Sequence, residues 1–234
     1  GRCEGEQEGE QRMLSALLLA LGSSAAVLPT RQTLLEAVAP LDRGFKATSS
    51  QRAHIASILG TLTQQQPAKD ALALNGDWEL VWSDAPDIVG SSFGEALVGV
   101  GGLSGPLAAA VRIGQSIDAQ VGTITNIIEY QPPEWLTAAV PGLAKDRLQQ
   151  RVILSYETSG RRCDLTVRGA AIAPRTALGI SLLALPPLEL KGPLSLPFGS
   201  FEVLYNDGDL RVVRTQQGYY GVNRRLPEGE SWSL

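Results

Sequence analysis

The chain has 234 residues, of which 44% are hydrophobic and 19% charged, so it can bury a core as one domain with an appendage or as two small ones. Its net charge of −4 and its pI of about 5.1 argue against broad binding to phosphate backbones, which needs a basic face. One histidine, His54, and two distant cysteines, Cys3 and Cys163, are poor material for a zinc site, a histidine-assisted catalytic centre or a disulfide framework, and they fit a reducing compartment.

An acidic run opens the chain and precedes the apolar segment MLSALLLALGSSAAVLP at 13–29. No uncharged apolar run reaches the length of about 18 residues that a membrane-spanning helix needs. Three interpretations are open for this segment: the remnant of a targeting sequence, an ordinary first helix, or a helix that lies on a membrane or a partner. We therefore expect 1–29 to be a leader or a contacting helix and 30–234 to be the domain proper.

Residues 31–66 are predicted to form two amphipathic helices that face the core. The sequence Asp42-Arg43-Gly44 is a stop signal for the first helix, and Ser49 or Ser50 is the predicted cap of the second, which Pro67 ends. Apolar residues recur at helical spacing in both segments. These residues are Leu34, Leu35, Val38 and Leu41, followed by Ile55, Ile58, Leu59 and Leu62.

After Asn75 the apolar pattern changes from helical spacing to alternation. In GDWELVWS, Trp78, Leu80 and Trp82 share one face, as in a half-buried strand. Nine such segments with turn signals between them, and no helical pattern among them, predict a mostly antiparallel sheet or barrel that follows the N-terminal helices. The predicted strands are 76–83, 112–119, 122–130, 147–158, 162–169, 187–192, 199–206, 209–215 and 218–224.

Two apolar stretches, 88–111 and 173–199, interrupt this pattern. Both are too apolar for ordinary solvated loops, so they either fold over the mouth of a barrel or contact something apolar outside it.

No motif in the sequence carries a convincing catalytic signal. The glycines of GVGGLSG, 99–105, do not have dinucleotide-binding spacing, and no clear βαβ unit surrounds them. Carboxylates are present, but most of them occupy the polar faces of predicted strands and are expected to be solvated. They are Glu79, Asp118, Glu129, Glu157 and Asp209. We expect no catalytic residue, no metal and no cofactor.

The segment NDGDLRVVRTQQGYYGVNRR, 206–225, ends in arginines that require partners. A small up-and-down barrel must be plugged at one end, and Trp78 can do so beneath an arginine of a terminal strand. Alternation places Arg211 and Arg214 on opposite faces, so one of them shares a face with apolar residues and needs an aromatic ring, a carboxylate or an anionic ligand. We predict that Arg214 lies near Trp78 and Asp209, with Arg211 as the alternate.

Other charged residues of the C-terminal region have simpler predicted roles. Glu202 is a further candidate partner for the buried arginine, and Arg224 and Arg225 are expected to face solvent or lipid headgroups. Such groups can also hold the end of a barrel together without any ligand.

Taken together, these segments resemble the plastid lipid-associated proteins, or plastid fibrillins, whose domain is similar to a lipocalin. Two helices, LLEAVAPLDRGFKATSSQRAHIASILGTLTQQQP, precede LNGDWELVWS, which is similar to the family signature L-x-G-x-W-x-L-x-Y-x-S with Trp82 in place of Tyr. A strand pair follows in IGQSIDAQVGTITNIIEY, and a hairpin of the form Y-x-D-x-D-L-R-x-x-R runs from Tyr205 to Arg214. The resemblance covers about residues 31–225 and implies a lipocalin-like antiparallel β-barrel, although YYGVNRR departs from the family's usual apolar ending.

The resemblance also implies a function, namely non-catalytic binding of a hydrophobic small molecule such as an isoprenoid, quinone, carotenoid or fatty acid. The setting it implies is the chloroplast, at thylakoid membranes or plastoglobules, on the stromal side or in the lumen, with peripheral membrane contact. The predicted ligand-binding residues are Trp78, Trp82, Ile117, Ile128, Leu154, Tyr156, Val167, Phe201, Val203, Tyr205, Arg211 and Arg214.

Two other functions compete with this one. In the first, side chains fill the barrel, and the leader and apolar stretches dock on a thylakoid protein complex or membrane. In the second, the chain is an enzyme that acts on lipids, a view that rests only on the scattered carboxylates.

Overall fold

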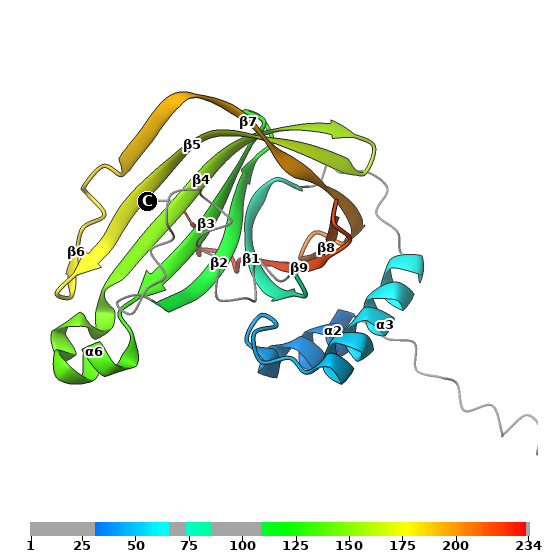
Figure 1. Ribbon diagram of the computed structural model, residues 1–234, viewed down its shortest axis with the longest axis horizontal. Helices are drawn as coiled ribbons and strands as arrows, with labels where there is room; N and C mark the ends of the chain where they lie inside the picture. Colours follow the sequence, from blue (N-terminus) through cyan, green and yellow to red (C-terminus); the bar gives the residue numbers. More distant parts are fainter. Residues whose placement is uncertain (1–30, 66–73, 86–108, 233–234) are drawn as a thin grey trace, which may run out of the picture.

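Eight antiparallel strands close into a barrel in the computed structural model, which describes residues 31–65, 74–85 and 109–232 (Figure 1). Successive strands are neighbours, and the barrel closes where the first strand pairs with the last, with Trp78 opposite Arg225. The lipocalin-like fold is therefore confirmed. The strands are β1 (Gly76–Ser83), β2 (Ala109–Asp118), β3 (Thr123–Gln131), β4 (Arg147–Ser159), β5 (Arg162–Ala177), β7 (Leu188–Asn206), β8 (Leu210–Thr215) and β9 (Tyr220–Arg225), and a two-residue strand, β6 (Ile180–Ser181), pairs with the end of β5.

The stretch 173–199 was expected to interrupt the strand pattern, but it is largely part of the sheet. It supplies the end of β5, the short β6 and the first half of β7, so the strands predicted at 187–192 and 199–206 are one strand. The first half of β7 pairs with β5 alone, and such an edge tolerates proline. Most of the other apolar stretch, 88–108 of 88–111, lies outside the described residues, and its last three residues belong to β2. The GVGGLSG motif and the leader 1–29 also lie outside the described residues.

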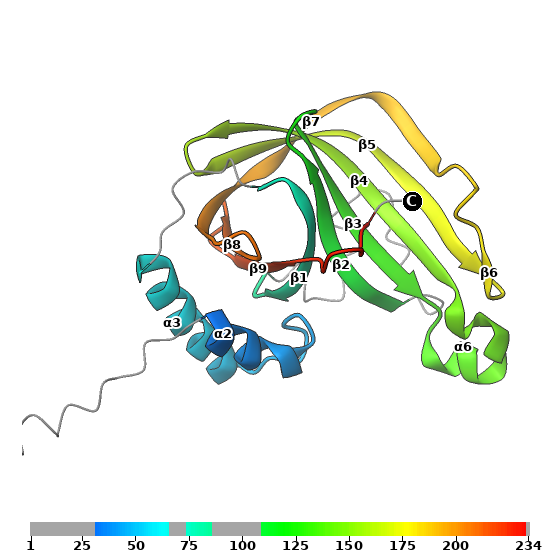
Figure 2. The same cartoon turned by 180° about the vertical axis from the view of Figure 1, so that it is seen from behind.

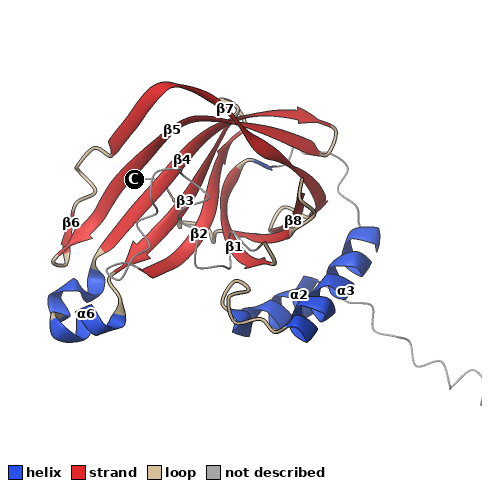
Figure 3. Cartoon of the chain, in the orientation of Figure 1, coloured by secondary structure: helices blue, strands red, loops and turns tan. Residues whose placement is uncertain are grey.

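Helices occur at two places outside the barrel (Figure 3). Between β3 and β4, α6 (Glu134–Ala139) and the 3-10 helix η3 (Pro141–Lys145) form a short helical connection that the strand pattern did not predict. On another side, α2 (Arg31–Val38), the 3-10 helix η1 (Ala39–Leu41) and α3 (Ser49–Gln65) confirm the predicted helix pair. Among the helices of the described ranges, none is long and apolar enough to cross a membrane.

Local sequence explains how the helix pair is joined. The stop at Asp42-Arg43-Gly44 is confirmed, because all three residues have positive φ angles of 48°, 57° and 104°. The predicted N-cap of α3 was Ser49 or Ser50, and this prediction was wrong, because Thr48 caps the helix. Its hydroxyl accepts the Gln51 N–H at 3.3 Å, and its own N–H donates to Gln51 Oε1 at 2.9 Å, which is a capping box.

The helix pair packs on the outer face of β1, β8, β9 and the end of β7, and this contact corrects two sequence predictions. Trp82 and Tyr205 were expected to face the barrel interior, but both are buried with Leu34 and Leu59 under the helices. The cause is a register shift in each strand, between Leu80 and Trp82 in β1 and between Val203 and Tyr205 in β7. A bulge adds one residue and moves the following side chains to the other face.

The chain beyond β9 covers the outer face of β2 and β3 (Figure 2). Trp232, 1% exposed, is buried against Ile127, and its indole N–H donates to the Trp78 carbonyl at 3.0 Å. Arg112 lies 4.6 Å from the ring centroid. Gly114 makes this possible, because a Cβ at that position would lie only 2.5 Å from the indole. This segment therefore secures β1 and β2 from outside.

Candidate functional site

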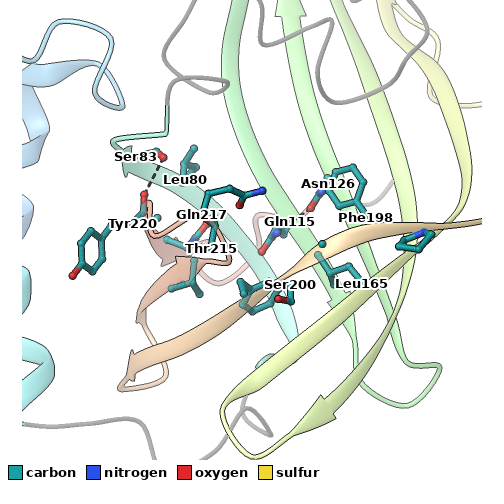
Figure 4. Close-up of a pocket in the computed structure, with 16 residues that line it drawn as sticks. Leu80, Ser83, Gln115, Asn126, Leu165, Phe198, Ser200, Thr215, Gln217 and Tyr220 are labelled. Atoms are coloured by element: carbon teal, nitrogen blue, oxygen red, sulfur yellow. Dashed lines mark hydrogen bonds between the residues drawn. The ribbon is translucent and has the colours of Figure 1, made fainter.

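A cavity of about 400 Å³ lies inside one half of the barrel (Figure 4). Its volume is in the lower part of the range for small-molecule sites. Seven strands contribute to its walls, and the wall combines apolar side chains with neutral amides. The interior residues that line it include Leu80, Gln115, Asn126, Leu165, Phe198, Phe201, Val213 and Asn223.

The other half of the barrel is filled by side chains. Trp78 and Leu154 have no exposed surface and pack with Ile117, Ile124 and Val203 in one cluster. The predicted residues Ile117, Leu154, Phe201 and Val203 belong to this cluster, Tyr156 and Val167 pack against it, and Ile128 is buried in a neighbouring one. Apart from Trp82, Tyr205 and Arg214, the predicted residues face the interior, but of the twelve predicted ligand-binding residues only Phe201 lines the cavity.

Two polar cavity residues, Gln115 and Asn126, were missed from the sequence. They lie on adjacent strands, and Gln115 Nε2 donates to Asn126 Oδ1 at 2.9 Å (Figure 4). The sequence could have predicted this position, because Gln115 lies two residues from both Ile113 and Ile117 and therefore points to the same, inward face of the strand. Asn126 stands in the same way between Ile124 and Ile128. A polar residue at an inward position of a barrel strand indicates a polar function in the interior.

Trp78 closes the filled end of the barrel, as predicted. Its indole N–H donates to the Leu74 carbonyl at 2.7 Å. Two guanidinium groups lie over the ring, that of Arg225 at 4.4 Å from a ring centroid and that of Arg211 at 4.7 Å. Both distances are within the range of cation–π attraction.

The identity of these arginines corrects two predictions. Arg214, the preferred anchor, points outward, is about half exposed and pairs with Glu202 at 3.3 Å. Leu210 and Val212 face the helices, so alternation along β8 turns Arg211 inward and Arg214 outward. Arg225, expected in solvent, donates to the carbonyl oxygens of Asn75 and Gly208 and fixes the end of the barrel.

Arg211 is the most unusual residue of the interior because it is fully buried. Its Nη2 donates to Gln115 Oε1, whereas Nε and Nη1 have no hydrogen-bond partner among the described residues. Desolvation lowers the pKa of Arg211 to about 9, and the charge of Arg225 contributes in the same direction. At neutral pH the barrel therefore contains a buried cation.

The thiol of Cys163, which interacts electrostatically with Arg211, does not neutralise that charge. Burial raises the pKa of the Cys163 thiol to about 11, although the positive charge of Arg211 opposes the shift. The thiol is consequently protonated at neutral pH. Cys163 is a free, buried cysteine in the same packed cluster as Trp78.

The carboxylates considered for catalysis lie outside the barrel. Glu79 pairs with Arg112 at 3.1 Å and with Arg224 at 3.0 Å, and Asp209 pairs with Arg31. His54 is exposed on α3. Within the described part of the chain, no group of three or more histidine, cysteine, aspartate or glutamate side chains could hold a metal ion.

A second feature is an exposed apolar edge where β5, β6, β7 and the α6–η3 connection meet. The two parts of this edge are held together, because Thr176 Oγ1 donates to the Lys145 carbonyl at 2.6 Å and the Gly179 N–H donates to Asp146. Side-chain exposure ranges from 44% at Val140 to 75% at Leu188. We call this surface the apolar edge, and it consists of Trp135, Val140, Leu178, Ile180, Leu183, Leu185 and Leu188.

Comparison with known proteins agrees with this architecture. The family model PAP_fibrillin matches residues 29–222. Plastid lipid-associated protein 2, chloroplastic, from Brassica campestris is 25% identical to this chain over an alignment 237 residues long, and the alignment covers 87% of this chain and 72% of that protein. No solved structure matches the chain. The family resemblance drawn from the helix pair, the Trp78 signature and the closing hairpin is thereby confirmed, and the chain belongs to the PAP_fibrillin family.

Proposed function

We propose that this chain binds a hydrophobic small molecule in the cavity of its barrel and has no catalytic activity. The observation that carries the proposal is the cavity itself, which Leu80, Leu165 and Phe198 line with apolar surface beside neutral amides. Apolar walls provide affinity through burial, and a few polar groups orient the ligand. The ligand classes we propose are isoprenoids, quinones, carotenoids and fatty acids.

The proposed setting is the chloroplast, at thylakoid membranes or plastoglobules. The name of the Brassica relative, a chloroplastic plastid lipid-associated protein, supports this setting. The apolar edge supports peripheral contact with a lipid surface, because it gathers seven exposed apolar side chains on neighbouring elements, and large exposed apolar patches often mark interaction sites.

Recovery of a ligand from the protein's own membranes tests the binding function. Protein extracted gently from plastid membranes should carry a stoichiometric hydrophobic molecule by native mass spectrometry, and denaturation should release it. Leu165→Trp, which fills the cavity, should abolish this load. Leu196→Trp makes the same substitution at a site that is 58% exposed, so it should leave the load unchanged. Equal loads in both variants would exclude the cavity as the binding site.

Membrane contact is tested separately with vesicles of uncharged galactolipids. The double variant Leu178→Glu and Ile180→Glu places two charges on the apolar edge and should sharply reduce co-sedimentation with the vesicles. Val121→Glu is the matched control, because Val121 is 70% exposed on the β2–β3 turn and is no part of that edge. Equal binding by both variants would rule out contact through the apolar edge.

The filled half of the barrel favours a second candidate, a structural subunit that docks on a thylakoid protein complex. Trp78, Leu154 and Val203 have no exposed surface, so much of the interior provides packing rather than space. A structural subunit would be recovered without ligand and would remain bound only while the complex stays intact. The same mass-spectrometric experiment therefore separates the two candidates.

A further inference from the structure

The buried charge of Arg211 has no counter-ion among the described residues. It forms no ion pair there, and its guanidinium hydrogen-bonds to Gln115 and lies over the ring of Trp78. By contrast, Arg214 on the same strand pairs with Glu202, and Arg224 pairs with Glu79. A buried guanidinium without an anion is costly, because burial removes the hydration of its charge and no carboxylate of the described residues pairs with it.

The polar contacts around Arg211 lead to the cavity. Gln115 contacts Arg211 through Oε1, and it also lines the cavity and donates to Asn126, another lining residue. Asn223 lies opposite Arg211 in the β8–β9 pair and lines the cavity too. Gln115 therefore connects the buried charge to the open space, and the neutral amides of Asn126 and Asn223 line the same cavity. Neutral amides can share hydrogen bonds with an anion, whereas a carboxylate in their place would repel it.

We propose that Arg211 anchors the carboxylate group of a single-chain lipid whose hydrocarbon chain occupies the cavity, an inference that rests on the proposed ligand-binding function. The carboxylate accepts N–H groups of the guanidinium beside Gln115, and the chain extends along Leu165, Phe198 and Leu80. A guanidinium presents a planar fork that matches a carboxylate in shape.

The free donors of Arg211 and the cavity volume favour this class over larger anionic lipids. Arg211 contacts the amide of Gln115, whereas Nε and Nη1 of Arg225 donate to the carbonyl oxygens of Gly208 and Asn75. The donors of Arg211 that have no partner among the described residues, Nε and Nη1, match the two oxygens of one carboxylate. A cavity of about 400 Å³ also suits one hydrocarbon chain rather than a two-chain phospholipid.

The test compares two probes of equal chain length, laurate and 1-dodecanol, on the delipidated full chain by isothermal titration calorimetry. The wild type should bind laurate about tenfold to a hundredfold more tightly, as a charge-assisted hydrogen bond predicts. Arg211→Met should remove this preference and still bind dodecanol. Arg214→Met is the matched control on the same strand and should keep the preference, because Arg214 points outward.

Each other outcome overturns a distinct part of the reasoning. Equal wild-type affinities for laurate and dodecanol overturn the carboxylate anchor but leave the ligand-binding function intact, and this comparison needs no variant to fold. A laurate preference that survives in Arg211→Met overturns the role of Arg211. Tighter Arg211-dependent binding of dodecyl phosphate overturns the assignment to a carboxylate. Failure of both laurate and dodecanol to bind overturns the anchor and the ligand-binding function together.

Discussion

Gly114→Ala should destabilise the barrel strongly, although it adds only one methyl group. The added Cβ would collide with the Trp78 carbonyl oxygen and would lie 2.5 Å from Cζ2 and 2.7 Å from Cε2 of Trp232. The carbonyl belongs to the β1–β2 ladder, where Gly114 faces Glu79, so it cannot move away without breaking strand pairing. The indole must therefore leave its position.

The expected cost follows from what the displaced indole loses. Exposure of a large, fully buried aromatic side chain costs about 2–3 kcal/mol. Loss of its hydrogen bond to the Trp78 carbonyl adds about 1 kcal/mol. Residual overpacking against the backbone brings the expected loss in the free energy of unfolding to about 3–5 kcal/mol.

Urea denaturation measures this loss, and Gly60→Ala provides the control. Gly60 lies inside α3, and nothing is within 4 Å of its Cβ position, so alanine there should stabilise the protein by about 0.5–1 kcal/mol. Limited proteolysis should show that residues beyond 226 become accessible in Gly114→Ala alone. A change smaller than about 0.5 kcal/mol in Gly114→Ala, or a terminus that stays protected, would refute this account.

Two further predictions concern titratable groups. Burial alone would raise the pKa of Asp207, but bonds from the Leu210 and Asp209 N–H groups and the Tyr205 hydroxyl outweigh it, so the pKa is lowered. Because the pKa of Asp207 is lower in the folded than in the unfolded chain, its carboxylate stabilises the fold above about pH 4. This stabilisation is lost as the pH falls through the folded-state pKa. Urea midpoints between about pH 5 and pH 3 should fall more steeply in the wild type than in Asp207→Asn, and parallel curves would contradict this. Since the Cys163 pKa is about 11, alkylation by iodoacetamide at about pH 8 should follow global unfolding, as peptide mapping can show, and fast alkylation of folded protein would be inconsistent with its burial.

Much of the fold could be predicted because alternation is a local property of the chain. Trp78 and the isoleucines of β2 and β3 have the predicted parity, and their spacing was sufficient to predict strands and a barrel. Capping was less predictable, because Thr48, Ser49 and Ser50 are all good caps. Only the placement of Gln51 three residues later distinguishes Thr48.

The site was less predictable because it depends on contacts that are not local. The bulges that turn Trp82 and Tyr205 outward have no marker in the sequence, since they arise from pairing with β9 and β8. Which of Arg211 and Arg214 faces inward depended on the position of the helices, which cover Leu210 and Val212. The role of Arg225 depended on barrel closure, which brings it to Trp78 and Asn75.

The pairing of β1 with β9 also bears on how a ribosome can make this protein. The barrel cannot close until β9 has emerged from the ribosome, so Trp78 and Trp82 of β1 lack their pairing partners in β9 until then. At ordinary translation speeds this interval is on the order of ten to thirty seconds. Contacts of such long sequence separation also slow folding itself. A nascent chain that displays two tryptophans for so long is a natural client for a chaperone, and truncation before β9 should yield an aggregation-prone product rather than a smaller barrel.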